Sequence, residues 1–282
     1  MFNTFARSWA LVRASFRVLM SDQELVIFPV ISSIALLAVT AVFVLPLALT
    51  AGTGGVFTED GLSIVGVIVL FLYYTASYTV IIFANSALVG AALIRLRGGD
   101  PTISDGFRIA GERFGKILGY ALIAATVGTV LQIIRERVGA IGQIVIGLVG
   151  MAWNLATYLV IPVLVTEDVG PIEAVKRSAG LLKDTWGSQI VGNFSISGIF
   201  FLVGLAVTIL IGVPLFAIGA NANSGAVAAI AVIAIILIWA IIALISSTLQ
   251  AIYTAALYRY ATTGDAGEFF DSELVQSAFR AK

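Results

Sequence analysis

The chain contains no cysteine and no histidine, and only 11% of its 282 residues are charged. Without cysteine there are no disulfide bonds and no thiol nucleophile, and without histidine there is no histidine-ligated metal or haem and no Ser-His-Asp triad. The apolar centres of its long hydrophobic stretches also lack Asp, Glu, Lys and Arg. Proton-coupled transporters, pumps and voltage sensors depend on such charges. We therefore expect no enzyme, no metal or other cofactor, and no proton relay.

Apolar residues are abundant, at 60% of the chain, whereas roughly 45 to 50% is typical of a soluble domain. Six apolar stretches each reach the roughly 20 residues that cross a hydrocarbon core of about 30 Å. They lie at about 25–50, 62–94, 116–134, 143–166, 190–220 and 225–258. The sequence therefore predicts an all-α, polytopic membrane protein with six transmembrane helices.

Two features predict helices that are not simple straight spans. Pro46 and Pro214 lie near the ends of the first and fifth stretches, where each is expected to kink or break its helix. The second and sixth stretches are longer than the bilayer core requires. We expect them to tilt, kink or extend beyond the bilayer.

The basic residues are distributed unevenly about the six stretches. Of 16 Lys and Arg residues, 14 lie on the side of the two termini, and only Arg135 and Arg137 lie on the other side. Because cytoplasmic loops are enriched in Lys and Arg, this distribution predicts a protein of the cytoplasmic (inner) membrane with both termini in the cytoplasm.

A pattern near the N-terminus returns in the second half of the chain. The segment 2–16, which includes Arg7-Ser8, resembles the segment 172–186, which includes Arg177-Ser178, and a fainter copy begins at Pro101. Each copy is predicted to be an amphipathic helix that precedes a pair of long apolar stretches. We predict a single membrane domain, 1–282, with repeat units at about 1–97, 101–166 and 170–262 and a cytoplasmic tail at 263–282.

The amphipathic segments concentrate the positive charge, so anionic lipid headgroups are their expected partner. For the two Arg-Ser pairs, two interpretations stay open. The arginine binds lipid phosphate, or its stem packs on the protein while the serine supports a turn. The residues expected to contact headgroups are Arg7, Arg13, Arg17, Lys176, Arg177 and Lys183.

Neutral polar residues enter the apolar stretches, mostly in the cytoplasmic half. They either form interhelical hydrogen bonds worth about 0.6 kcal/mol each or line a cavity that opens to the cytoplasm. Asn154, Thr157 and Tyr158 fall at positions i, i+3 and i+4, which places them on one face of the fourth span. The candidate cavity residues are Asn85, Asn154, Tyr158, Asn193 and Gln250.

Three motifs carry a resemblance to a known family. They are Arg7-Ser8-Trp9, the stretch 25–29 (Leu-Val-Ile-Phe-Pro), and the stretch 161–178, which includes Glu167-Asp168 and Gly170-Pro171. The chain resembles an uncharacterised family of prokaryotic six-span membrane proteins. More distantly it is similar to the membrane domain found beside glycerophosphodiester phosphodiesterase catalytic domains. The resemblance implies architecture and membrane location, and it implies no reaction.

Two functions from different classes fit these observations. The leading hypothesis is a non-catalytic membrane protein that organises lipid or a partner protein through its basic amphipathic helices. The alternative is a passive channel or a permease for lipid or small solutes, which requires the neutral polar residues to converge. A stripe of Gly111, Gly115 and Gly119 allows close helix packing, either within one subunit or in a homo-oligomer. No nucleic-acid partner is expected.

Overall fold

The fold was examined in a computed structural model that describes residues 2–49, 55–58, 61–186, 196–221 and 225–276. The prediction of an all-α polytopic membrane protein is confirmed. Within these ranges six helical segments are long and apolar enough to cross a membrane: Gln23–Leu49, Ile64–Leu96, Phe114–Arg137, Ala140–Thr166, Phe200–Ile218 and Ala229–Thr263. The β-structure described is one short antiparallel ladder between β1 (Phe57–Thr58) and β2 (Gly61–Leu62).

A shorter helix precedes each pair of long helices. α1 (Phe2–Ser21) precedes α2 (Ile27–Leu49) and α3 (Ile64–Leu96), and α4 (Ile103–Glu112) precedes α5 (Phe114–Arg137) and α6 (Ala140–Ala156). After α7 (Val160–Thr166), α8 (Pro171–Trp186) precedes α9 (Ile196–Val207), α10 (Val213–Asn221) and α11 (Gly225–Thr263). This order matches the order of elements in the predicted repeat, while the internal repeat itself stays a prediction.

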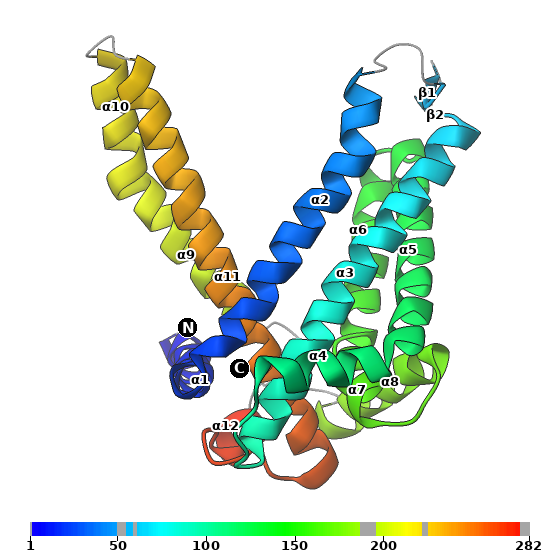
Figure 1. Cartoon of the computed structure of the whole chain (residues 1–282), viewed down its shortest axis with the longest axis vertical. Coiled ribbons are helices and arrows are strands. Elements are labelled where there is room, and N and C mark those ends of the chain that lie inside the picture. The colour runs from blue at the N-terminus through cyan, green and yellow to red at the C-terminus, as the bar shows by residue number, and fades with distance from the viewer. Residues whose placement is uncertain (1, 50–54, 59–60, 187–195, 222–224, 277–282) are drawn as a thin grey trace.

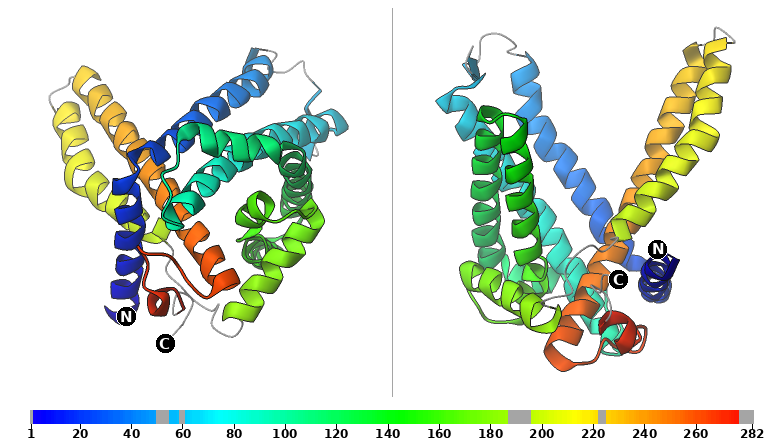
Figure 2. Two further views of the ribbon diagram at one scale, coloured as in Figure 1. Left: turned by 60° about the horizontal axis from the view of Figure 1, so that its bottom comes forward. Right: turned by 180° about the vertical axis from the view of Figure 1, so that it is seen from behind.

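The short helices gather at one end of the bundle. Figures 1 and 2 show α1, α4, α8 and the C-terminal α12 (Ser272–Gln276) at that end, which we call the collar. α12 belongs to a segment that packs back on the protein, because Phe270 and Val275 are buried. Arg135 and Arg137 end α5 at the opposite end of the bundle.

The buried core lies at the collar and not midway along the spans. α3 is buried without interruption from 86 to 93, and α11 from 251 to 258. Both stretches are rich in alanine, and small residues let helices approach closely without a bulky side chain between them. Towards the other end, the same helices expose large apolar side chains, as expected of surfaces that face lipid.

The spans diverge from the collar as two arms. In Figure 1 the arm of α9, α10 and α11 points away from the arm that contains α2, α3, α5 and α6. Within the first arm, Trp239 of α11 packs against Gly204 of α9, and its Nε1 donates a hydrogen bond of 2.9 Å to Thr208 Oγ1. Both arms are joined at the collar, where the lower part of α11 contacts α3 and α1.

The two prolines that were predicted to kink or break their helices have different outcomes. α2 continues through Pro46, so the expected break there is absent from the described helix. In the fifth span the α-helix is interrupted as predicted, because a π-helical turn, Thr208–Gly212, separates α9 from α10 directly before Pro214. The fourth span, by contrast, is broken between α6 and α7, at 157–159. Pro162 explains this break, because it offers no N–H to the carbonyl of Tyr158 four residues earlier.

Candidate functional site

Two adjoining cavities lie in the half of the bundle nearer the collar. The smaller, about 270 Å³, is lined by α3, α7, α11 and the turn at Tyr158, and the larger, about 330 Å³, by α3, α5, α6 and the start of α7. Asn85 of α3 and Ile161 of α7 line both. The two cavities therefore meet at Asn85.

The cavities bring together four of the five predicted cavity residues. Asn85, Tyr158 and Gln250 line the smaller cavity, and Asn85 and Asn154 line the larger one. Asn193 lies outside the described residues. The sequence alone does not show that these residues meet, because Asn85 on α3 and Gln250 on α11 lie far apart in the chain.

The break in the fourth span separates two residues that were expected on one helix face. α6 ends at Ala156, so Asn154 belongs to the helix and lines the larger cavity, whereas Tyr158 lies in the turn and lines the smaller one. The expectation of one shared face was wrong for Tyr158, because it assumed a continuous helix, whereas Thr157 lines the larger cavity together with Asn154. The break gives each cavity a polar side chain from the same span.

Hydrogen bonds hold the broken segment in place. The hydroxyl of Thr157 donates to the carbonyl of Trp153 at 2.8 Å, and Thr157 lines the larger cavity together with Tyr120 of α5. The N–H of Leu159 donates to Ser178 Oγ of α8 at 2.9 Å, and both residues are buried. Ser178 thus satisfies a backbone donor that the break would otherwise leave unpaired inside the protein.

The chemistry of the lining is neutral. The side chains that line the cavities supply amides from Asn and Gln and hydroxyls from Ser, Thr and Tyr, and no charged residue is among them. Such groups donate and accept hydrogen bonds without demanding a counter-charge. The site suits an uncharged polar group with an apolar body, because apolar side chains fill much of the remaining lining. Within the described part of the chain, no group of three or more acidic residues is placed to hold a metal ion.

Sequence reasoning missed the residues that create the space. The larger cavity borders Ala124 and Gly128 of α5 and Gly150 of α6, where large side chains are absent. Ala124 and Gly128 are four residues apart, a small-residue pair that was a usable signal. Tyr120 and Thr254 were also missed, although each lines the same cavity as a residue of the turn: Tyr120 with Thr157 and Thr254 with Tyr158.

The six predicted headgroup residues lie in different surroundings. Arg177 forms an ion pair with Glu167 at 3.1 Å, and Arg17 Nη2 donates to the carbonyl of Phe269 at 3.0 Å. Arg13, Lys176 and Lys183 are exposed and form no ion pair within the ranges that the structure describes. The side chain of Arg7 lies outside the described residues.

The acidic turn before α8 ties several helices together. Asp168 forms ion pairs with Lys116 and, at 2.8 Å, with Arg113. The hydrogen bonds from these two residues lower the pKa of Asp168, and the one from Lys116 contributes most. Glu167 accepts a hydrogen bond of 3.0 Å from Tyr258 of α11 in addition to its pair with Arg177. Both carboxylates are therefore engaged in holding α5, α8 and α11 at the collar.

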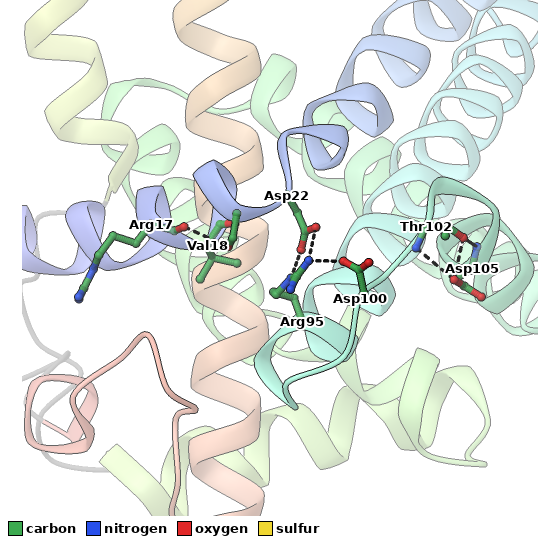
Figure 3. Close-up of polar contacts among 8 residues, drawn as sticks. Arg17, Val18, Asp22, Arg95, Asp100, Thr102 and Asp105 are labelled. Carbon is green, nitrogen blue, oxygen red and sulfur yellow. Dashed lines mark hydrogen bonds and ion pairs between the residues drawn. The ribbon is translucent and has the colours of Figure 1, made fainter.

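Further ion pairs mark matched positions at the ends of α3 and α11. Figure 3 shows Arg95 between Asp22 and Asp100, with Arg95 Nη2 at 2.5 Å from Asp100 Oδ1. Arg259, at the corresponding position of α11, pairs with Asp265 at 2.6 Å. In both places an arginine near the end of a long helix pairs with an aspartate of the turn that follows: Arg95 with Asp100 and Arg259 with Asp265.

Figure 3 also shows the start of α4. The Thr102 side chain accepts a hydrogen bond from the N–H of Asp105, and the Asp105 carboxylate accepts one from the N–H of Thr102. This capping box satisfies two helix-terminal donors. A further hydrogen bond, from the hydroxyl of Thr102, is the main cause that lowers the pKa of Asp105 to about 2.

The glycine stripe is divided between two environments. A Cβ added at Gly119 would lie 2.8 Å from Pro171 of α8, so this position serves packing within the chain. A Cβ at Gly111 or Gly115 would meet no atom of the described neighbours within 4 Å.

Fold and cavities together define an all-α, polytopic integral membrane protein with a neutral polar site inside its helix bundle. The chain belongs to the family of unknown function DUF6159, whose sequence profile matches residues 64–269. That range runs from the first residue of α3 to the segment before α12. No curated protein matches the chain.

Proposed function

We propose that this protein is a non-catalytic membrane protein that binds an uncharged polar or amphipathic molecule in the two cavities around Asn85, and that it acts as a passive permease for that molecule. The observation that carries the proposal is the convergence of Asn85, Asn154, Tyr158 and Gln250 on two adjoining cavities. A permease with a neutral polar cavity requires this convergence, and a bundle held only by scattered interhelical hydrogen bonds does not.

The broken fourth span supports the same proposal. An interrupted helix within a membrane is tolerated where it is buried in protein or lines a cavity. Here the interruption at 157–159 lies beside both cavities, and α8 holds it through the hydrogen bond from the N–H of Leu159 to Ser178. Discontinuous helices of this kind line substrate sites in many transporters.

The orientation belongs to the proposal as well. We place the protein in the cytoplasmic membrane, with both termini and the collar in the cytoplasm, because the basic residues concentrate at the collar and Arg135 and Arg137 lie at the other end. The cavities would then open towards the cytoplasm. A prokaryotic origin and a distant similarity to the membrane domain beside glycerophosphodiester phosphodiesterases rest on the sequence motifs alone.

The proposal can be tested with two measurements on the same variants. Native mass spectrometry of the protein extracted gently from its own membrane reports any retained small molecule or lipid. Stopped-flow light scattering of reconstituted vesicles reports permeability to glycerol, a small uncharged solute. We expect Asn85→Leu, at the junction of the cavities, to lose both the retained mass and the glycerol flux.

Two further variants separate chemistry from volume and from general damage. Gly150→Leu is designed to occupy the larger cavity without removing a polar group, and it is expected to block flux. Thr126→Val is the matched control, because Thr126 lies on α5 outside both cavities and bonds only the carbonyl of Leu122 in its own helix. If wild type retains no molecule and passes no glycerol, or if Asn85→Leu behaves like Thr126→Val, the proposal is wrong.

A further inference from the structure

α1 presents an exposed apolar stripe that no other element covers in the described structure. Trp9, Phe16 and Met20 are 44%, 44% and 53% exposed. Positions seven and eleven residues apart lie two and three turns along, on one face of a helix. The opposite face, with Leu11, Ala14 and Val18, is buried against the protein. The stripe therefore points away from the bundle.

Two arginines border this stripe. Arg13 and Arg17 are exposed, and helical spacing places them along one edge of the stripe. Arg17 reaches the carbonyl of Phe269, in the segment before α12, so its guanidinium lies on the side of the C-terminal segment. Arg13, next to it on the exposed face, has no ion-pair partner among the described residues.

The position of α1 suits a membrane surface. α1 is seen nearly end-on in Figure 1, whereas the spans run up the page, so α1 lies across the end of the bundle. A helix that lies in the membrane interface buries Trp, Phe and similar residues at the acyl boundary and keeps Lys and Arg among the headgroups. The α1 surface has both parts side by side.

We propose that the surface of α1 formed by Trp9, Arg13, Phe16, Arg17 and Met20 docks on anionic phospholipid headgroups. Charge complementarity selects this occupant: two cations beside an apolar stripe, on a helix that ends at Ser21 directly before the first span begins at Gln23, match a surface of phosphate over acyl chains. The copy of this helix at α8 does not share the property, because its tryptophan, Trp186, is only 1% exposed and Arg177 is paired with Glu167.

The absence of cysteine makes a direct test practical, because a single introduced cysteine can be spin-labelled without background labelling. A spin label on Phe16→Cys measures the environment of the apolar stripe of α1, and a spin label on Lys183→Cys measures the environment of the exposed face of α8. Each labelled protein is reconstituted in phosphatidylcholine vesicles and in vesicles of phosphatidylcholine mixed with phosphatidylglycerol. Accessibility of the label to oxygen, which concentrates in lipid, is compared with accessibility to a water-soluble nickel complex.

We expect the label at position 16 to favour oxygen, and more strongly in the vesicles that contain phosphatidylglycerol. Addition of Arg13→Gln is expected to abolish that difference between the two vesicles. The label at position 183 is expected to favour the nickel complex in both. A label at position 16 that favours the nickel complex in both vesicles, or that is shielded from both reagents by a protein contact, would overturn the proposal.

Discussion

α1 and α8 begin from the same sequence pattern and have opposite surroundings. In both, an Arg-Ser pair is followed three residues later by leucine, and an aromatic residue closes the pattern. In α8 the aromatic residue is Trp186, which is buried and donates its Nε1–H to the carbonyl of Val275 at 3.3 Å. In α1 the aromatic residue is Phe16, which is exposed together with Trp9.

The difference shows that an amphipathic pattern does not specify what its apolar face contacts. α8 packs on α5, α6, α7 and α11, so protein covers its apolar face. α1 lies at the edge of the collar, where α9, α11 and α12 cover only one side. The same periodicity therefore yields a buried apolar face in α8 and an exposed apolar stripe in α1.

The largest expected effect contrasts the tryptophans of the two helices. Trp186→Ala removes a buried ring and is expected to lower the free energy of unfolding by about 3 to 5 kcal/mol. Trp9→Ala removes a ring that is 44% exposed, so we expect a loss below about 1 kcal/mol. Unfolding of both variants in the same detergent micelles, followed by loss of helicity, measures the difference. Equal losses would show that α1 is as deeply packed as α8.

A smaller contrast concerns two buried serines. Ser178→Ala leaves the N–H of Leu159 without its acceptor and is expected to cost about 1 to 3 kcal/mol. Ser15 of α1 is also buried, but its hydroxyl has no hydrogen-bond partner among the described residues, so Ser15→Ala is expected to be neutral or slightly stabilising. The same unfolding measurement applies. A large loss for Ser15→Ala would reveal a partner for its hydroxyl.

The two arginines provide a third contrast, in two different readouts. Arg177→Gln breaks the pair with Glu167, and since Arg177 is 47% exposed we expect a loss of at most about 1 kcal/mol in unfolding free energy. Arg13→Gln is expected to leave the unfolding free energy unchanged. It is expected to weaken only the effect of phosphatidylglycerol on the oxygen accessibility of the label at position 16. If Arg177→Gln instead abolished the effect of phosphatidylglycerol and left the unfolding free energy unchanged, Arg177 and not Arg13 would be the residue that contacts headgroups.

The smallest effect is a pH dependence confined to the approach to α8. Hydrogen bonds from Lys116 and Arg113 lower the pKa of Asp168 below its unfolded value of about 3.9, so this contribution is present above about pH 4 and is lost as the pH falls through the folded pKa. Backbone hydrogen exchange at 167–172 should therefore speed up at acidic pH. α1 contains no acidic residue and should change less.

Asp168→Asn is the control for this last experiment. It removes the titrating group, so exchange at 167–172 should be fast already at neutral pH and should change little on acidification. An unchanged pH response in Asp168→Asn would assign the effect to another carboxylate.

Much of the architecture was predictable because lipid imposes a simple rule on the chain. A stretch of about 20 apolar residues must satisfy its backbone hydrogen bonds internally, so length and hydropathy alone located all six spans. The residues that depart from this rule were harder to predict. Pro162 was visible in the sequence, but the break it causes also needs partners for the freed backbone groups, and one of these, Ser178 of α8, lies on a different helix and accepts the N–H of Leu159.

The candidate site was predictable in its chemistry and not in its shape. Neutral polar residues in apolar spans flagged Asn85, Asn154, Tyr158 and Gln250, because such groups need partners or a cavity. The space itself depends on Gly128 and Gly150, where missing side chains of α5 and α6 happen to face one volume. The sequence does not distinguish a glycine that faces a cavity from one that faces lipid or a neighbouring helix, so it could not predict the cavity.

The sequence by itself determined that this is a membrane protein, how many spans it has and that its interior is chemically neutral. These properties follow from the composition and the local periodicity of the chain. Only the tertiary structure decided that the apolar face of α8 is buried while that of α1 is partly exposed, where the fourth span breaks and which polar side chains meet. These depend on contacts between segments far apart in the chain, such as Leu159 with Ser178 and Trp186 with Val275, and no local pattern encodes them.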